Sequence, residues 1–125
     1  MKANELRINN YVNIEGDVVK VKEIFDKGIH YTCCEYESYA TEDFIQPIEL
    51  TEDVLVKIGF EGEMYEFCLL ADDANITVNL IEHRVDISFF GNCEAELLIK
   101  YNVKYLHEIQ NAYYLLTNEE MEVEL

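Results

Sequence analysis

The sequence predicts an α+β fold, built mostly from antiparallel strands, with a short helix in the middle of the chain and a longer helix near its end. Two observations predict this class. Short runs of β-branched and aromatic residues alternate with compact turns over much of the chain, a pattern typical of β-meanders. Apolar residues recur at helical spacing near the C-terminal end. At 125 residues, half of them hydrophobic, the chain is expected to form one compact domain over residues 1–125.

The first third of the chain predicts a three-stranded meander. Its strands are expected at residues 11–14, 18–25 and 29–33, with Gly16 and Gly28 in the intervening turns. Each glycine would supply the positive φ that a tight hairpin turn requires. Three short curled strands of this kind indicate a small SH3-like barrel.

The middle strand of this meander has two different faces. Strict alternation puts Val19, Val21 and Glu23 on one face and Lys20 and Lys22 on the other. The lysines are therefore expected on a partly solvated side of the sheet.

The middle of the chain predicts a short extended run at residues 44–48, which Pro47 restricts to an edge or a strand end, followed by a helix of barely two turns. Thr51 is a suitable N-cap, and the two acidic residues after it lie at the positive end of the helix dipole. Gly59 is placed to end the helix.

A second meander is expected from runs at residues 64–70, 76–81 and 85–90, with residues 97–101 as an extension of its sheet. These runs are rich in β-branched and aromatic residues and are separated by polar segments. The fold class therefore has a second sheet besides the N-terminal meander.

The longest helix is predicted from Asn102, as its N-cap, to about Thr117. Asn118 follows it and tolerates the left-handed conformation of a helix C-cap. The tail, residues 119–125, alternates acidic and apolar residues, which predicts an edge strand with its carboxylates on one face.

The charge of the chain is strongly one-sided. The formal net charge is -17, and residues 31–125 carry 21 Asp and Glu against four Lys and Arg. A surface of this sign repels nucleic acid and anionic membranes and attracts basic protein surfaces. We therefore expect a basic protein as the partner, with no direct binding to nucleic acid or membrane.

No apolar run approaches the length of a membrane span, and the N-terminus lacks the apolar core of a signal peptide. A cytoplasmic location is therefore expected.

Residues that could carry chemistry are scattered. Three histidines and two serines stand without a motif, and no glycine-rich phosphate loop is present, so we predict no catalytic residue, no cofactor and no enzymatic activity. A zinc site is an alternative that lacks ligand spacing; its members would be His30, Cys33, Cys68 and Cys93. Reduced, buried cysteines are the simpler interpretation. A small enzyme using paired carboxylates is a third, weaker alternative.

The glutamates show a pattern of their own. Several recur at an interval of two residues, which on an extended strand places them on one face about 6 to 7 Å apart. Rows of carboxylates at this spacing resemble the charge ladder of a nucleic-acid backbone, and tyrosines among them would add aromatic anchors. The predicted partner-binding residues are Glu35, Glu37, Tyr39, Glu61, Glu63, Glu66, Asp72 and Asp73.

Four segments resemble a family of short, uncharacterised bacterial and prophage proteins. They are Asn4-Glu5-Leu6-Arg7-Ile8-Asn9-Asn10-Tyr11-Val12, Pro47-Ile48-Glu49-Leu50-Thr51-Glu52, Lys104-Tyr105-Leu106-His107-Glu108-Ile109-Gln110-Asn111 and Leu116-Thr117-Asn118-Glu119-Glu120. Members usually carry glycine where Asn9 and Asn118 stand here, and asparagine adopts the same backbone conformation. The resemblance leaves residues 61–100 uncovered. It implies a phage-like context and no catalytic residue.

Two functions follow as hypotheses. The first is a non-enzymatic acidic protein, encoded by a phage or prophage, that occupies the basic nucleic-acid-binding surface of a host nuclease or effector, as an anti-CRISPR-like or other anti-defence inhibitor would. The alternative is a small cytoplasmic interaction or assembly protein, such as a homodimer, whose acidity serves only solubility. Salt separates them, because an electrostatic complex loosens as ionic strength rises and a hydrophobic dimer does not.

Overall fold

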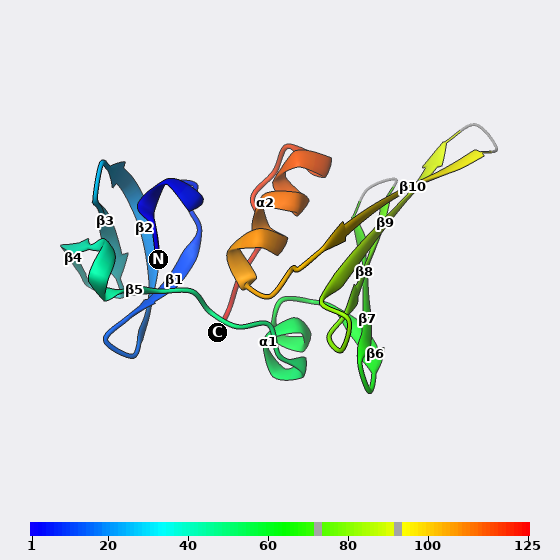
Figure 1. Cartoon of the computed structure of the whole chain (residues 1–125), viewed down its shortest axis with the longest axis horizontal. Coiled ribbons are helices and arrows are strands. Elements are labelled where there is room, and N and C mark those ends of the chain that lie inside the picture. The colour runs from blue at the N-terminus through cyan, green and yellow to red at the C-terminus, as the bar shows by residue number, and fades with distance from the viewer. Residues whose placement is uncertain (72–73, 92–93) are drawn as a thin grey trace. The chain divides into compact units, whose positions relative to one another are not determined.

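The computed structural model describes residues 1–71, 74–91 and 94–125, and the side chains of residues 90–98 lie outside the description. The chain divides into two compact units, one made of residues 1–49 and 105–111 and the other of residues 50–104 and 112–125. Each unit contains one five-stranded antiparallel sheet (Figure 1). Together with one short and one longer α-helix, these sheets confirm the predicted α+β class. The expectation of a single domain over residues 1–125 stays a prediction.

The first unit is built on a sheet with strand order β4-β3-β2-β1-β5. Its strands are β1 (Tyr11–Ile14), β2 (Asp17–Phe25), β3 (Gly28–Cys33), β4 (Tyr36–Thr41) and β5 (Ile45–Gln46), with a 3-10 helix at Glu42–Phe44 before β5. The three strands predicted for the first third of the chain are confirmed. β5 returns to pair with β1, so the meander curls back on itself as the SH3-like prediction requires.

The interior of this unit comes from one face of each strand. Val12, Val19, Val21 and Ile29 are buried, while their neighbours along β1 and β2 are mostly more exposed, as the period of two predicts. Another 3-10 helix, Ala3–Glu5, adds the buried side chain of Ala3 to the same cluster.

Residues 105–111 join the first unit through amide groups. The backbone N–H of Tyr11 donates to Oε1 of Gln110 at 2.9 Å, and Nε2 of Gln110 donates to the carbonyl of Asn9 at 3.2 Å. Nδ2 of Asn10 donates to Oδ1 of Asn111 at 2.9 Å. Gln110 and Asn10 are almost completely buried, so these hydrogen bonds satisfy groups that water does not reach.

Two predictions for the first meander need correction. Gly16 has the expected positive φ of 90°, but Gly28 does not; it lies in β3, where an added Cβ would stand 2.5 Å from the carbonyl oxygen of Ala40. Glycine is needed at position 28 for the close approach of β4. The strict alternation predicted for the middle strand also fails, because the β2–β3 register shifts between Val21 and Glu23 and makes Lys22 an extra, bulged residue.

The second unit contains the other sheet, with strand order β10-β9-β8-β7-β6. Its strands are β6 (Glu61–Glu63), β7 (Glu66–Ala71), β8 (Ala74–Asn79), β9 (Arg84–Gly91) and β10 (Glu94–Tyr101). The second meander is confirmed. The single strand predicted over residues 64–70 is wrong at its start, because Met64 has a φ of 59° and lies in a turn between β6 and β7.

Helix α1 (Glu52–Lys57) precedes this sheet, and its predicted ends are confirmed. The hydroxyl oxygen of Thr51 accepts a hydrogen bond from the backbone N–H of Val54 at 3.2 Å, and Gly59 follows the helix with a φ of 102°. The buried side chains of Leu55, Phe60 and Phe67 contribute to the interior of the second unit.

Helix α2 (Leu106–Thr117) starts later than predicted. Asn102 has a φ of 60° and is not the N-cap; the backbone N–H of Tyr105 instead donates to the carboxylate of Glu108 at 3.3 Å, as in one half of a capping box. Asn118 has a φ of 58°, which confirms it as the left-handed residue after the helix. The edge strand predicted for residues 119–125 is wrong, because this tail forms no strand and buries Met121.

Candidate functional site

The predicted partner-binding residues fall into two groups, one in each unit. Glu35, Glu37 and Tyr39 belong to the first unit, and Glu61, Glu63 and Glu66 belong to the second. Asp72 and Asp73 lie outside the described residues. Each group is therefore considered by itself.

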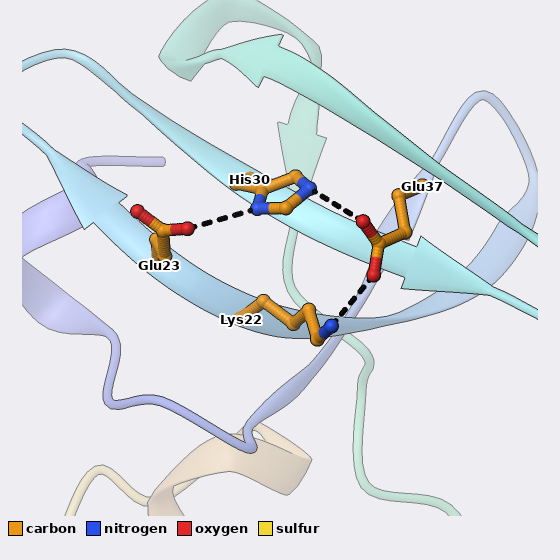
Figure 2. Close-up of polar contacts among 4 residues, drawn as sticks. All are labelled: Lys22, Glu23, His30 and Glu37. Atoms are coloured by element: carbon orange, nitrogen blue, oxygen red, sulfur yellow. Dashed lines mark hydrogen bonds and ion pairs between the residues drawn. The ribbon is translucent and has the colours of Figure 1, made fainter.

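In the first unit, strands β2, β3 and β4 hold a cluster of charged side chains (Figure 2). Nζ of Lys22 lies 2.6 Å from Oε1 of Glu37. The ring of His30 lies between two carboxylates, with Nδ1 at 3.2 Å from Glu23 and Nε2 at 3.5 Å from the other oxygen of Glu37. A neutral imidazole donates from one nitrogen only, so donation to both carboxylates requires the protonated ring.

The register of the sheet explains this cluster. Glu23 is directly opposite His30 across the β2–β3 pair, and His30 is directly opposite Tyr39 across the β3–β4 pair. The bulge brings Lys22 beside Glu37. Glu37 is thus engaged by two groups of its own unit.

The contact with Lys22 changes the acidity of both partners. Hydrogen bonding and charge attraction from Lys22 lower the pKa of Glu37 below its usual value, and the charge of His30 adds to the effect. The same hydrogen bond from Glu37 raises the pKa of Lys22. Both groups are solvent-exposed, so the pair fixes an arrangement of side chains rather than supplying much stability.

Aromatic side chains cover this cluster. The ring of Tyr39 stacks on His30 with 4.7 Å between the centroids, and Phe25 lies 5.9 Å from Tyr39. Tyr39 nevertheless remains 69% exposed. It is the predicted aromatic anchor, and the structure places it next to Glu37.

Glu35 does not share a strand face with Glu37. Strand β4 begins at Tyr36, and residues 34–35 form the turn between Cys33 and Tyr36, with a φ of 52° at Cys34. The period of two therefore does not apply to this pair. Residues 120, 122 and 124 likewise lie in no strand, and the side chains of residues 94 and 96 lie outside the description.

In the second unit, three carboxylates do share a face. Glu63 on β6 is directly opposite Glu66 on β7, and Glu61 lies two residues before Glu63 on the same face of β6. We call Glu61, Glu63 and Glu66 the acidic hairpin. All three residues are exposed, on the face opposite that of the buried Phe67.

The acidic hairpin has no cationic partner within the described part of the chain. Lys57 pairs with Asp53 at 3.1 Å, and Arg84 pairs with Glu82 and Asp86 at 2.9 and 3.1 Å. The second unit as a whole contains 15 Asp and Glu against four Lys and Arg, while the first contains 11 against five. The hairpin thus concentrates uncompensated charge in the more acidic unit.

The backbone of the acidic hairpin is unusually specific. An added Cβ at Gly62 would lie 2.0 Å from the carbonyl oxygen of Glu66, so only glycine allows this pairing of β6 with β7. Met64 occupies the turn in a left-handed conformation, with 81% of its surface exposed. An apolar side chain therefore projects next to three carboxylates.

Sequence reasoning missed the contacts of Lys22, Glu23 and His30. The sequence did contain a signal for one of these contacts. A two-residue turn at Asp26 and Lys27 pairs Phe25 with Gly28, and the same register two residues further from the turn pairs Glu23 with His30. No sequence feature predicts the bulge at Lys22.

Of the alternative zinc set, Cys33 is a buried free thiol and Cys68 an exposed one, while Cys93 lies outside the described residues. Among the residues that are described, no group of three or more His, Cys, Asp or Glu is placed to hold a metal ion.

Comparisons with models of protein families, with curated protein sequences and with solved structures found no match to this chain. In the described part of the chain, no helix has the length and apolar character needed to cross a membrane.

Proposed function

We propose that this chain is a non-enzymatic acidic binding protein that occupies a basic, nucleic-acid-binding surface of another protein. The partner we propose is a nuclease or effector of a bacterial host, met in the cytoplasm, and the chain would block it in the manner of a phage-encoded anti-defence inhibitor. The one-sided charge of the chain supports this function, and the phage-like context is what the resemblance of four sequence segments would imply.

The observation that supports this function best is the acidic hairpin. Glu63 and Glu66 are directly opposite each other, and like charges in that position destabilise a strand pair. A cationic partner would relieve this repulsion on binding. Destabilising arrangements of this kind are often retained where binding needs them.

The exposed side chain of Met64 adds an apolar contact to the charged ones. A flexible thioether adapts to irregular surfaces, and an anchor surrounded by charged groups is a common arrangement at interfaces. The three carboxylates would steer the approach of a basic surface, and Met64 would contribute to its retention.

The test compares three forms of the protein as bait for lysate proteins of a bacterial host at low salt. The first is the parent chain, and the second carries Glu61→Gln, Glu63→Gln and Glu66→Gln. The third carries Glu119→Gln, Glu122→Gln and Glu124→Gln, which gives the same net charge with the acidic hairpin intact. Retained proteins are identified, and their release by salt and by added DNA or RNA is measured.

We expect the parent and the tail variant to retain the same basic nucleic-acid-binding proteins. Release should occur as salt shortens the screening length below about 8 Å, and added nucleic acid should compete. The hairpin variant should bind about tenfold more weakly, because three weak charge contacts are lost together. Equal binding by the hairpin variant, or a complex that added nucleic acid does not displace, would refute the proposal.

A further inference from the structure

Strand β4 differs from the other edge strands in being unprotected. β5 has only two residues and is followed by Pro47, β6 has three residues of which two are glutamates, and β10 carries Lys100. Short length, proline and charge are the usual ways in which edge strands avoid pairing with other chains. Strand β4 has six residues, none of them Pro or Lys. Its one carboxylate, that of Glu37, is already engaged by Lys22 and His30.

The register shows which backbone groups of β4 face outward. The N–H of Glu42, just past the strand, donates to the carbonyl of Lys27 at 3.0 Å. Because inward and outward groups alternate along an antiparallel strand, the N–H and C=O groups of Glu37, Tyr39 and Thr41 face the open edge. Among the described residues, no backbone hydrogen bond from elsewhere in the chain reaches these three.

A hollow lies on each side of this edge. One, of about 340 Å³, has a mainly apolar lining that includes Phe25 and Tyr39. The other, of about 360 Å³, has a more polar lining that includes Glu15, Tyr31 and Ser38. Tyr39, Ala40 and Thr41 line both hollows, so the two hollows meet at β4. The side chains of Phe25 and Tyr39 lie on one face of the sheet, and the register pair of Tyr31 and Ser38 lies on the other.

We propose that β4 is a docking strand for an extended cationic segment of a partner protein, in which apolar residues alternate with Lys or Arg. The segment pairs with the backbone of Glu37, Tyr39 and Thr41. Its apolar side chains enter the hollow beside Phe25, and its cationic side chains enter the hollow beside Glu15. Strand addition of this kind takes affinity from main-chain hydrogen bonds and specificity from alternate side-chain pockets.

The charge around β4 favours a cationic segment as the chain that pairs with it. The residues around β4 include the exposed carboxylates of Glu15, Glu35 and Asp43, with Lys27 as a cation in the apolar hollow. Pairing with β4 of a second copy would bring these carboxylates together, whereas a cationic segment neutralises them. This inference stands on the first unit and does not require the acidic hairpin.

The test uses a peptide of about ten residues with alternating Val and Lys, titrated into the full chain and followed by backbone amide shifts. Two control peptides are a Val and Glu version and a Val and Lys version with every second amide N-methylated, which cannot pair along one edge. The protein variant is Thr41→Pro, because Thr41 has a φ of -81° that proline adopts and an N–H that faces outward. Thr41→Val is its matched control, since it keeps the N–H.

We expect saturable shifts at residues 37–41 with the Val and Lys peptide only. Loss of an edge hydrogen bond should make Thr41→Pro bind about tenfold more weakly, while Thr41→Val binds like the parent. The proposal would be overturned if the N-methylated peptide bound the parent protein as tightly as the Val and Lys peptide does. It would also be overturned if Thr41→Pro bound the Val and Lys peptide as tightly as the parent does. Shifts at residues 37–41 that depend on protein concentration without peptide would also overturn it, because the occupant would then be a second copy.

Discussion

The β3–β4 hairpin of the first unit and the β6–β7 hairpin of the second both display glutamates on an exposed face, but they use them differently. Glu37 is held by Lys22 and His30, whereas Glu63 faces Glu66. The first unit has a formal net charge of -6 and the second of -11. The number of carboxylates therefore does not measure the anionic surface that a protein offers. Strand register decides which of them meet a cation and which meet each other.

Gln110→Leu should lower the stability of the protein most, and it tests whether residues 105–111 are part of the first unit. The variant removes the buried amide group that accepts from the N–H of Tyr11 and donates to the carbonyl of Asn9, both of which are partly buried. We expect the free energy of unfolding to fall by about 2 to 4 kcal/mol. Amide hydrogen exchange should show the loss of protection first in β1 and β2. Leu115→Ala is the control on the same helix, because Leu115 is almost fully exposed and should change little.

Two glycine substitutions test whether the arrangement of the carboxylates matters for binding, apart from their number. Gly62→Ala keeps every carboxylate but forces β6 away from Glu66, and Gly28→Ala does the same to the β3–β4 pair. Each should cost about 1 to 3 kcal/mol of stability, measured by denaturant unfolding. Gly62→Ala should weaken the binding of a lysine homopeptide as much as charge removal does. Gly28→Ala should leave the binding of that homopeptide unchanged and instead weaken the binding of the Val and Lys peptide to β4. The reverse result would assign the anionic surface to the first unit.

A smaller effect is expected when the acidic hairpin is neutralised. The variant with Gln at positions 61, 63 and 66 should gain about 0.5 kcal/mol in stability, because the repulsion between Glu63 and Glu66 is removed. The tail variant with Gln at 119, 122 and 124 should not differ from the parent. A hairpin variant less stable than the parent would show that these carboxylates are already compensated.

The smallest effect concerns the pKa of Glu37, read by carbon chemical shifts during a pH titration. Lys22 lowers this pKa, so the stabilising effect of the pair is present above the usual carboxyl pKa and is lost as the pH falls through the lowered one. Lys22→Met should raise the pKa of Glu37 toward its usual value. Lys20→Met removes a cation from the same strand and should have much less effect. Equal shifts in the two variants would argue against a specific pair.

Local signals in the sequence account for much of the fold. Thr51 and Gly59 delimit α1, and Gly16 marks the first turn, because caps and turns depend on a few neighbouring residues. The turn at Met64 was missed because no glycine, asparagine or proline marks it. The start of α2 was misplaced because Asn102, a good N-cap residue by type, adopts a left-handed conformation instead.

The candidate site was predictable only where it depends on the period of a strand. That Glu61 and Glu63 share a face follows from alternation alone. That Glu66 joins them depends on the turn at Met64, and that Lys22 engages Glu37 depends on a bulge and a three-strand register. Such pairings between strands are set by tertiary contacts, and the residue pattern of a single strand does not predict them.

We expect the acidic hairpin, and not the cluster around Glu37, to be the anionic surface that a polycation meets first. The most direct measurement is an amide-shift titration of the full chain with a lysine homopeptide of about ten residues at low salt. We predict that the shifts begin at residues 61–66 at the lowest peptide concentrations and disappear on raising the salt. Shifts that begin around Glu37, or that appear equally in both units, would show that the acidic hairpin is not the preferred anionic surface.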